Sequence, residues 1–387
     1  MSNPCRHGSP RPLRGKPLRY GAVALLSTGL LFIGIATAWA DDGSITLDFV
    51  RHAQAENNVP GLLDTQPPGQ PLTDLGQSQA QALVNQLGSE NVQGIYASQF
   101  TEDSQTATPL ADHLDLPVQI LPGLNDIPAG IFNGLGANDY TAFNDLVGAL
   151  YLLGPLAWTF GLYFVPELGD PSFNGAEFED LFGGSVQTIY DSTTGGNTDA
   201  AFAAEASVAI WTLMNVNNPD FSLIFGDALK TGDFLPYTGI AVVQGEPGDW
   251  TLVSWDGQPV PPASLPTELF VDVRDLITAP QMAAYNIWEA ILTGDPTTIE
   301  NAIGTGIGEV GKAIVNFPIV VITDILNALQ GDIPNSLANL GAGLNLDTLL
   351  GDLSTDLTNL VPTMANDLAG LLPGELGTMV GAALAAF

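Results

Sequence analysis

The sequence predicts an α/β fold: a mainly parallel sheet with helices on both faces, an apolar helical insert and an α-helical C-terminal extension. Three observations lead to this prediction. Short runs rich in β-branched and aromatic residues alternate with amphipathic segments, which is typical of folds built on a parallel sheet. An uncharged run interrupts this alternation at residues 146–166. From about residue 278 the chain is dominated by Leu, Ala, Gly, Asn and Asp.

The expected elements follow one another from residue 44. SITLDFV predicts a buried strand, LTDLGQSQAQALVNQL a helix, VQGIYAS a second strand and DSQTATPLADHL a second helix. LPVQILPGL predicts a third extended segment, and the sheet pattern resumes with ASVAIWTLMNV. TGIAVVQ and WTLVSWDG predict a closing hairpin around a Gly-Glu-Pro-Gly-Asp turn. The Pro-rich stretch GQPVPPASLPTEL then ends a domain that covers residues 41–262.

The uncharged run LVGALYLLGPLAWTFGLYFVP lies within an insert of about residues 138–180. It is long enough to span a bilayer, but Pro155 and the internal glycines favour a helical insert that is either buried or lipid-facing. Residues 263–387 are expected to form a linker and a Leu/Ala/Gly-rich helical extension, because Leu recurs there at three- and four-residue spacing. A cap on the α/β domain and an association module both fit this extension.

The distribution of charge predicts export. Five of the nine Lys and Arg residues lie before residue 20, and the apolar run that follows them ends in Ala38-Trp39-Ala40. A basic start, an apolar run and a small-x-small tripeptide are the parts of a signal peptide. We therefore expect residues 1–40 to be removed near Ala40 and the protein to be secreted or held in the cell envelope. An uncleaved membrane anchor is the alternative.

Composition also restricts the partners and cofactors. Only four of the basic residues follow residue 20, against 42 acidic ones, so nucleic acid and anionic lipid headgroups are expected to be repelled. Cys5 is the only cysteine, and it lies in the predicted signal peptide. His52 and His113 are the only histidines after residue 40, which argues against a metal site. No cofactor is expected.

The end of the first predicted strand, FVRHAQAENN, carries a motif. It resembles the strand-end signature of the histidine phosphatase superfamily (phosphoglycerate mutase-like), with Arg51, His52, Gln54 and Asn58 in place and Ala53 where Gly is usual. YASQFTEDSQTATPLADHLDLPV and LPGLNDIPAGIFNG look like later segments of that family. The chain resembles most closely the exported mycobacterial members, which carry a WTLMN helix and a WTLVSWDG ending.

The resemblance implies roles for these residues. His52 matches the nucleophile that becomes phosphohistidine, and Arg51 matches an arginine that binds the phosphate oxygens. Asp126 matches the acid that protonates the leaving oxygen, one methylene shorter than the usual Glu. Asn58 and Gln54 match substrate-binding positions. The implied ligand is a small phosphorylated molecule.

Two further positions depart from the family pattern. The second arginine falls on Glu102 and the second histidine on Ala204. Without these two charge-assisted hydrogen bonds, phosphate binding is weaker by about 3–6 kcal/mol, so phosphomonoester hydrolysis is expected to be weak or lost. One alternative is a non-catalytic envelope protein that binds a lipid-like ligand with the apolar insert. Another is a competent phosphatase in which Lys230 or Arg274 replaces the missing cations. The sequence leaves the oligomeric state open.

Overall fold

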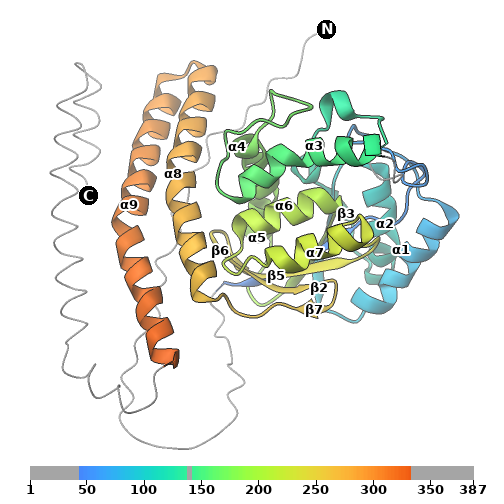
Figure 1. Ribbon diagram of the computed structural model, residues 1–387. Coiled ribbons are helices and arrows are strands. Elements are labelled where there is room, and N and C mark those ends of the chain that lie inside the picture. Colours follow the sequence, from blue (N-terminus) through green and yellow to red (C-terminus); the bar gives the residue numbers. More distant parts are fainter. Residues whose placement is uncertain (1–42, 137–141, 333–387) are drawn as a thin grey trace, which may run out of the picture.

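The computed structural model describes residues 43–136 and 142–332 (Figure 1). The predicted signal peptide and residues 333–387 of the extension lie outside the described residues, so neither prediction is tested there. Within the described part, a seven-stranded sheet carries helices, and the long helices α8 (Leu265–Thr293) and α9 (Pro296–Asp332) stand beside it. The domain boundary predicted near residue 262 falls between the last strand and α8.

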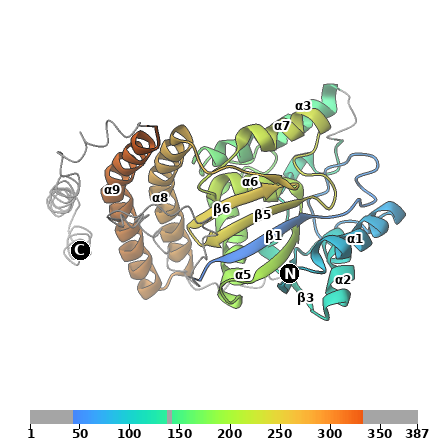
Figure 2. The same cartoon turned by 90° about the horizontal axis from the view of Figure 1, so that it is seen from below.

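The sheet has the strand order β3-β2-β4-β1-β5-β6-β7. Its strands, in chain order, are β1 (Ile45–Arg51), β2 (Val92–Ala97), β3 (Val118–Ile120), β4 (Thr198–Ala203), β5 (Ile240–Glu246), β6 (Asp249–Trp255) and β7 (Gln258–Pro259). The first four are parallel to one another, whereas β5 is antiparallel to β1, and β6 and β7 continue the antiparallel pairing. The α/β class is confirmed, but the sheet is mixed and not mainly parallel, because the predicted β5–β6 hairpin adds to β1 in the antiparallel sense (Figure 2).

Helices cover both faces of the sheet, as predicted. Successive side chains of a strand point to opposite faces, so a strand with apolar residues at successive positions needs a covering layer on each face. On β1, Phe49 packs in a core with Trp211, and its neighbour Val50 packs in a second core with Leu83. The helices are α1 (Asp74–Leu87), α2 (Thr101–Leu114), α3 (Ala142–Thr159), α4 (Gly175–Phe178), α5 (Gly184–Ser192), α6 (Glu205–Asn215), α7 (Phe221–Thr231), α8 and α9, with short turns η1 (Pro122–Leu124), η2 (Gly130–Phe132) and η3 (Glu179–Gly183).

The sequence prediction is wrong in part for one central element. The run ASVAIWTLMNV, expected from its pattern to continue the sheet, is helix α6, as the resemblance implied for its WTLMN part, and the strand β4 lies just before it. The β4 sequence TDAAFA is rich in Ala, which has a low strand propensity and gives no strand signal. Residues 207–214 of α6 are all buried, so this helix lacks the polar face by which an amphipathic helix is recognised.

The apolar run at residues 146–166 is not one continuous helix. Helix α3 ends at Thr159, and Gly161 then turns the chain with a φ of +81°. Tyr151 and Trp158 are buried in the main core, where the Trp158 indole N–H donates to the carbonyl oxygen of Val165 at 2.7 Å. The insert is therefore helical, as predicted, and one face of its helix belongs to the core of the domain.

The two C-terminal helices form a layered pair. Helix α8 packs on the domain, where the Gln281 amide donates to the carbonyl oxygen of Gly161 at 2.7 Å, and α9 packs on α8. Within the described residues, one helical segment, Pro296–Ile325 of α9, is long and apolar enough to cross a membrane by length and composition. Core helices and signal sequences meet the same criteria, so this property alone does not identify a span.

Candidate active site

Three strand ends meet at one edge of the sheet and form the site. Arg51, the last residue of β1, pairs in register with Ala203, the last residue of β4. Ala97, the last residue of β2, pairs with Phe202 of the same β4. The loops that follow these parallel strands therefore start side by side, which is where open α/β sheets place their ligands.

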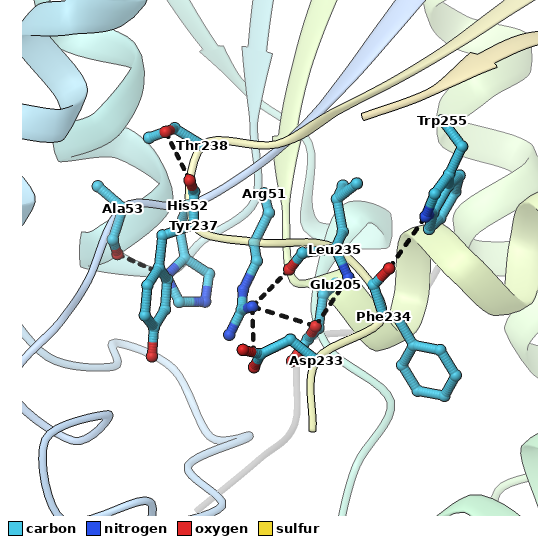
Figure 3. A network of polar contacts seen from close by, with 10 residues as sticks. All are labelled: Arg51, His52, Ala53, Glu205, Asp233, Phe234, Leu235, Tyr237, Thr238 and Trp255. Atoms are coloured by element: carbon cyan, nitrogen blue, oxygen red, sulfur yellow. Dashed lines mark hydrogen bonds and ion pairs between the residues drawn. The ribbon is translucent and has the colours of Figure 1, made fainter. Parts of the chain in front are cut away.

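His52 directly follows β1 and is 7% exposed. Its Nδ1 lies 2.8 Å from the carbonyl oxygen of Ala53 (Figure 3). A carbonyl oxygen only accepts hydrogen bonds, so Nδ1 carries the ring proton and the lone pair of Nε2 is left for attack. Burial, together with the positive charge of Arg51, lowers the pKa of His52 to about 4. The imidazole is thus neutral at physiological pH, in the tautomer that a nucleophile at Nε2 requires.

Ala53 fits its position without strain. Its φ is not among the positive values of the described residues, so the methyl group meets no backbone penalty. The side chain is fully buried with Ala55, Leu72 and Ala80, and its backbone N–H donates to Thr106 Oγ1 at 2.9 Å. The replacement of the usual Gly therefore leaves the His52 loop intact.

Arg51 is held by acidic partners. Its Nη1 lies 3.1 Å from Glu205 Oε2 and 3.0 Å from Asp233 Oδ1, and it also donates to the carbonyl oxygen of Leu235 (Figure 3). The guanidinium carbon is 4.1 Å from the centroid of the Tyr237 ring, a cation–π distance. The Arg51 side chain is only 5% exposed, so these interactions are weakly screened.

Glu205 and Asp233 are not identified by the sequence patterns. Glu205 is the first residue of α6, and Asp233 lies in the loop after α7. Burial, and after it the neighbouring Asp233, raises the pKa of Glu205 to about 7, although Arg51 acts against the shift. Glu205 Oε2 also accepts a hydrogen bond from the backbone N–H of Leu235 at 3.1 Å. This carboxylate thus links Arg51 to the loop that carries Asp233.

Asp126 lies in the loop between η1 and η2, where the Ser207 hydroxyl donates to its Oδ1 at 3.4 Å. Burial, followed by the charges of Asp103 and Glu102, raises the pKa of Asp126 well above its ordinary value. Asp103 is itself 2% exposed, accepts a hydrogen bond from Ser98 and has its pKa raised by burial to about 7. Burial and the neighbouring charges thus raise the pKa of Asp126 and shift its carboxyl towards the protonated form that a general acid needs before it donates.

Comparison with known proteins identifies the matching part of the chain. Residues 47–149 match the histidine phosphatase superfamily (branch 1). This segment belongs to the histidine phosphatase superfamily. The family prediction is confirmed by this match.

A curated relative covers more of the chain. The PE-PGRS family protein PE_PGRS11 of Mycobacterium tuberculosis (strain ATCC 25618 / H37Rv) is 48% identical over 297 residues, which is 74% of this chain and 49% of the relative. The chain thus spans about half the length of the curated relative that it matches. This similarity agrees with the predicted likeness to mycobacterial members.

Several solved structures are similar to this chain over about half of its length. A mutant phosphoserine phosphatase from Entamoeba histolytica is 18% identical, covers 55% of this chain and 97% of its own, and has a TM-score of 0.41. A mycobacterial glucosyl-3-phosphoglycerate phosphatase is 19% identical, covers 57% and 99%, and has a TM-score of 0.40. YhfR of Bacillus stearothermophilus is 17% identical, covers 55% and 97%, and has a TM-score of 0.42.

The two positions that are predicted to depart from the family pattern lie at the same edge of the sheet. Ala204 caps α6 immediately after Ala203, the register partner of Arg51, and presents only a methyl group. Glu102 lies in the first turn of α2 and is 3% exposed. Its Oε2 accepts a hydrogen bond from the backbone N–H of Gln70 at 2.9 Å, and burial raises its pKa to about 8. Glu102 thus links the loop that follows β1 to the first turn of α2 by a hydrogen bond.

The two predicted substrate-binding amides make contacts inside that loop. Gln54 Oε1 accepts a hydrogen bond from the Thr73 hydroxyl at 3.0 Å, and Asn58 Oδ1 accepts one from the backbone N–H of Ala55 at 2.8 Å. Both contacts stabilise the loop that leads from His52 to α1. The role of these residues in substrate binding stays a prediction.

Arg274, which the sequence offered as a substitute cation, is bonded away from Arg51 and His52. It is 1% exposed on α8, donates to the carbonyl oxygens of Leu213 at 2.9 Å and Val216 at 3.2 Å, and pairs with Asp275. These carbonyls lie at the C-terminal end of α6, whereas Arg51 pairs with Glu205 at its first residue, roughly 12–16 Å away along the helix axis.

Of the other two basic side chains considered from the sequence, only that of His113 is described by the structure. His113 is exposed in the last turn of α2, as expected of a helix-end residue. Lys230 lies in α7, and its side chain is outside the described residues. Among the residues that the structure describes, no group of three or more His, Cys, Asp and Glu side chains has an arrangement that could hold a metal ion.

Proposed function

We propose that this chain is a histidine phosphatase-like protein with weak or absent hydrolysis of phosphomonoesters. In that reaction Nε2 of His52 attacks phosphorus, the bond from phosphorus to the leaving oxygen breaks, and Asp126 gives that oxygen its proton. Water then cleaves the phosphohistidine, with the Asp126 carboxylate taking the proton back. The neutral imidazole and the raised pKa of Asp126 both suit these steps.

The observation that carries the proposal is the pairing of Arg51 with Glu205 and Asp233 at 3.1 and 3.0 Å. A phosphate dianion that approaches His52 needs the same guanidinium and meets two carboxylates already bound to it. Two opposite or like unit charges about 4 Å apart interact by roughly 4 kcal/mol at an effective dielectric constant near 20. Repulsion of this size adds to the missing cations at positions 102 and 204, so transition-state stabilisation is poor.

Phosphatase assays of the wild-type protein, His52→Ala and His113→Ala test this proposal. His113→Ala is a matched control, because it removes the same side chain from an exposed position on α2. With para-nitrophenyl phosphate as substrate, we expect all three proteins to show turnover near the background rate. Rapid turnover by the wild type and His113→Ala that disappears in His52→Ala would refute weak catalysis.

A second candidate function is a non-catalytic protein of the cell envelope that binds a lipid-like ligand with the apolar insert. The observation in its favour is that Leu146, Leu153 and Phe160 of the insert are 51–54% exposed although α3 is otherwise packed on the core. Native mass spectrometry of protein purified from its own envelope distinguishes the candidates. A retained amphiphile supports the binding function, and protein free of any amphiphile counts against it.

Export is part of the same proposal. The N-terminal sequence motivates removal of residues 1–40, which would leave Asp41 as the first residue. Intact mass measurement on protein recovered from the envelope or the medium of its own cells tests this expectation. A mass that includes residues 1–40 would contradict it.

A further inference from the structure

The outer face of α3 exposes a stripe of apolar side chains. Leu146, Leu153 and Phe160 are each separated by seven residues, close to two helical turns, and therefore lie on one face of the helix and its end. They are 54%, 54% and 51% exposed. Leu162 and Phe164, just after the helix, are both 49% exposed. These five side chains are called the α3 apolar surface below.

The outward orientation of this surface is fixed by the opposite face of the helix. The Tyr151 hydroxyl donates to the carbonyl oxygen of Ile127 at 2.9 Å, and Trp158 is fully buried with its N–H bonded to Val165. Rotation of α3 to hide the leucines would break both hydrogen bonds and expose two large aromatic rings. The apolar stripe is therefore exposed to solvent, because the opposite face of α3 is fixed by its packing on the core.

The α3 apolar surface continues onto neighbouring helices. The Phe160 ring stacks on Phe221 of α7 with the centroids 5.3 Å apart, and it meets the edge of Phe270 of α8 at 5.9 Å. Phe221 and Phe270 are both partly exposed. Exposed apolar residues from adjoining elements that gather in this way mark an interaction site more often than scattered ones do.

Charge identifies the kind of partner. Residues 146–166 contain no Asp, Glu, Lys or Arg, with Asp145 and Glu167 directly flanking them, whereas the chain as a whole has a formal charge of −33. A second copy would bring the same negative charge, and anionic headgroups would be repelled in the same way. The uncharged α3 apolar surface of this acidic protein therefore matches a partner with an apolar interior and an outer layer without net charge.

We propose that the α3 apolar surface docks the protein on a bilayer of zwitterionic lipid. Leucine and phenylalanine side chains enter the boundary between headgroups and acyl chains, as they do for helices that lie in the plane of a membrane. The hydrogen bond between Tyr151 and Ile127, next to Asp126, connects this surface to the loop that carries the candidate acid. Docking does not depend on catalysis at His52, so the two proposals can fail separately.

Flotation of the full chain with phosphatidylcholine vesicles tests the docking surface. The variant Leu146→Asp/Leu153→Asp adds two charges to the α3 apolar surface. Its control, Ile291→Asp/Leu292→Asp, adds two charges at positions of α8 that are 47% and 61% exposed. Near-ultraviolet circular dichroism verifies that both variants keep the wild-type core packing.

We expect the wild type and the α8 control to float with the vesicles and the α3 variant to partition at least about tenfold less, since two apolar side chains lose their burial. Vesicles that contain phosphatidylglycerol should bind the wild type more weakly. Equal flotation of wild type and α3 variant, or no flotation of the wild type, would overturn the proposal. So would a wild-type dimer, in the absence of vesicles, that the α3 variant dissociates.

Discussion

Replacing Glu205 by Gln should let Arg51 bind an oxyanion that the wild-type protein binds poorly. The substitution keeps an oxygen acceptor for the backbone N–H of Leu235, which now donates to Glu205 at 3.1 Å. It removes the charge that lies 3.1 Å from the Arg51 guanidinium. Asp233→Asn tests the second carboxylate, at 3.0 Å.

The size of the effect follows from the geometry of the ion pair. A charge-assisted hydrogen bond contributes about 1.5–3 kcal/mol, and returning one such bond to the ligand corresponds to roughly 10- to 150-fold tighter binding. The Glu205 side chain is 18% exposed and that of Asp233 is 32% exposed, so solvent screens Asp233 more. We therefore expect Glu205→Gln to have the larger effect.

The pKa of Glu205 supplies a second, independent readout. Because that pKa is raised to about 7, the carboxyl becomes protonated as the pH falls through neutrality and releases part of its hold on Arg51. Wild-type affinity for tungstate, whose charge stays constant in this range, should rise from pH 8 to pH 6. Glu205→Gln should lose most of this pH dependence.

Isothermal titration calorimetry with tungstate measures both effects. Asp112→Asn is the matched control, because it removes one negative charge from an exposed position on α2. If Glu205→Gln and Asp233→Asn remain folded but bind tungstate no more tightly than Asp112→Asn, then the paired carboxylates do not limit anion binding. In that case the pairing of Arg51 does not account for weak catalysis.

Three further predictions concern stability. The raised pKa values of Glu102 (about 8), Asp103 (about 7) and Glu205 (about 7) give stability that is present at low pH and lost as these groups ionise. His52, with a pKa lowered to about 4, opposes this trend only below its ordinary value of 6.5. The melting temperature should therefore fall between about pH 6.5 and pH 8, and a flat or rising profile by scanning fluorimetry would contradict this. Arg274→Met should lower the free energy of unfolding in urea by about 3 kcal/mol, since buried carbonyls lose their donor; a loss below about 0.5 kcal/mol would disprove that role. Glu102→Gln should stay near wild-type stability because it keeps an acceptor for the backbone N–H of Gln70. Glu102→Arg should lose about 1–3 kcal/mol of unfolding free energy in the same urea titration. Equal stabilities of these two variants would be inconsistent with the loop contact.

The local parts of the site could be predicted from the sequence. A buried strand that ends in Arg51 and His52 is a pattern of neighbouring residues, and the structure places both at the expected end of β1. Asp126 is located in the same way, by a short motif in a loop between recognisable elements. The tautomer of His52 and the raised pKa of Asp126 were not predictable, because both depend on burial and on groups from other segments.

The most consequential contact joins residues that are far apart in the sequence. Asp233 lies 182 positions after Arg51, in a loop without periodicity, so no pattern indicates that the two side chains meet. Glu102 gives a different lesson. The position is predicted from the family pattern, but its carboxylate binds the backbone of Gln70, a contact that depends on how the loop after β1 folds back over α2.

The replacements at this site are physically connected. An arginine that is 5% exposed cannot be left without a counter-charge, since an unpaired buried ion costs several kcal/mol. With Glu102 and Ala204 at the positions where the family pattern predicts cationic groups, a phosphate would be a poor counter-ion, and Glu205 and Asp233 supply the charge, Glu205 to a smaller extent once it is protonated. Restoring one cation at position 102 would therefore not restore phosphate binding, because Arg51 would still be paired and the Gln70 contact would be broken. Recovery requires the acidic partners of Arg51 to be neutralised at the same time, and tight tungstate binding by Glu102→Arg alone would disprove this dependence.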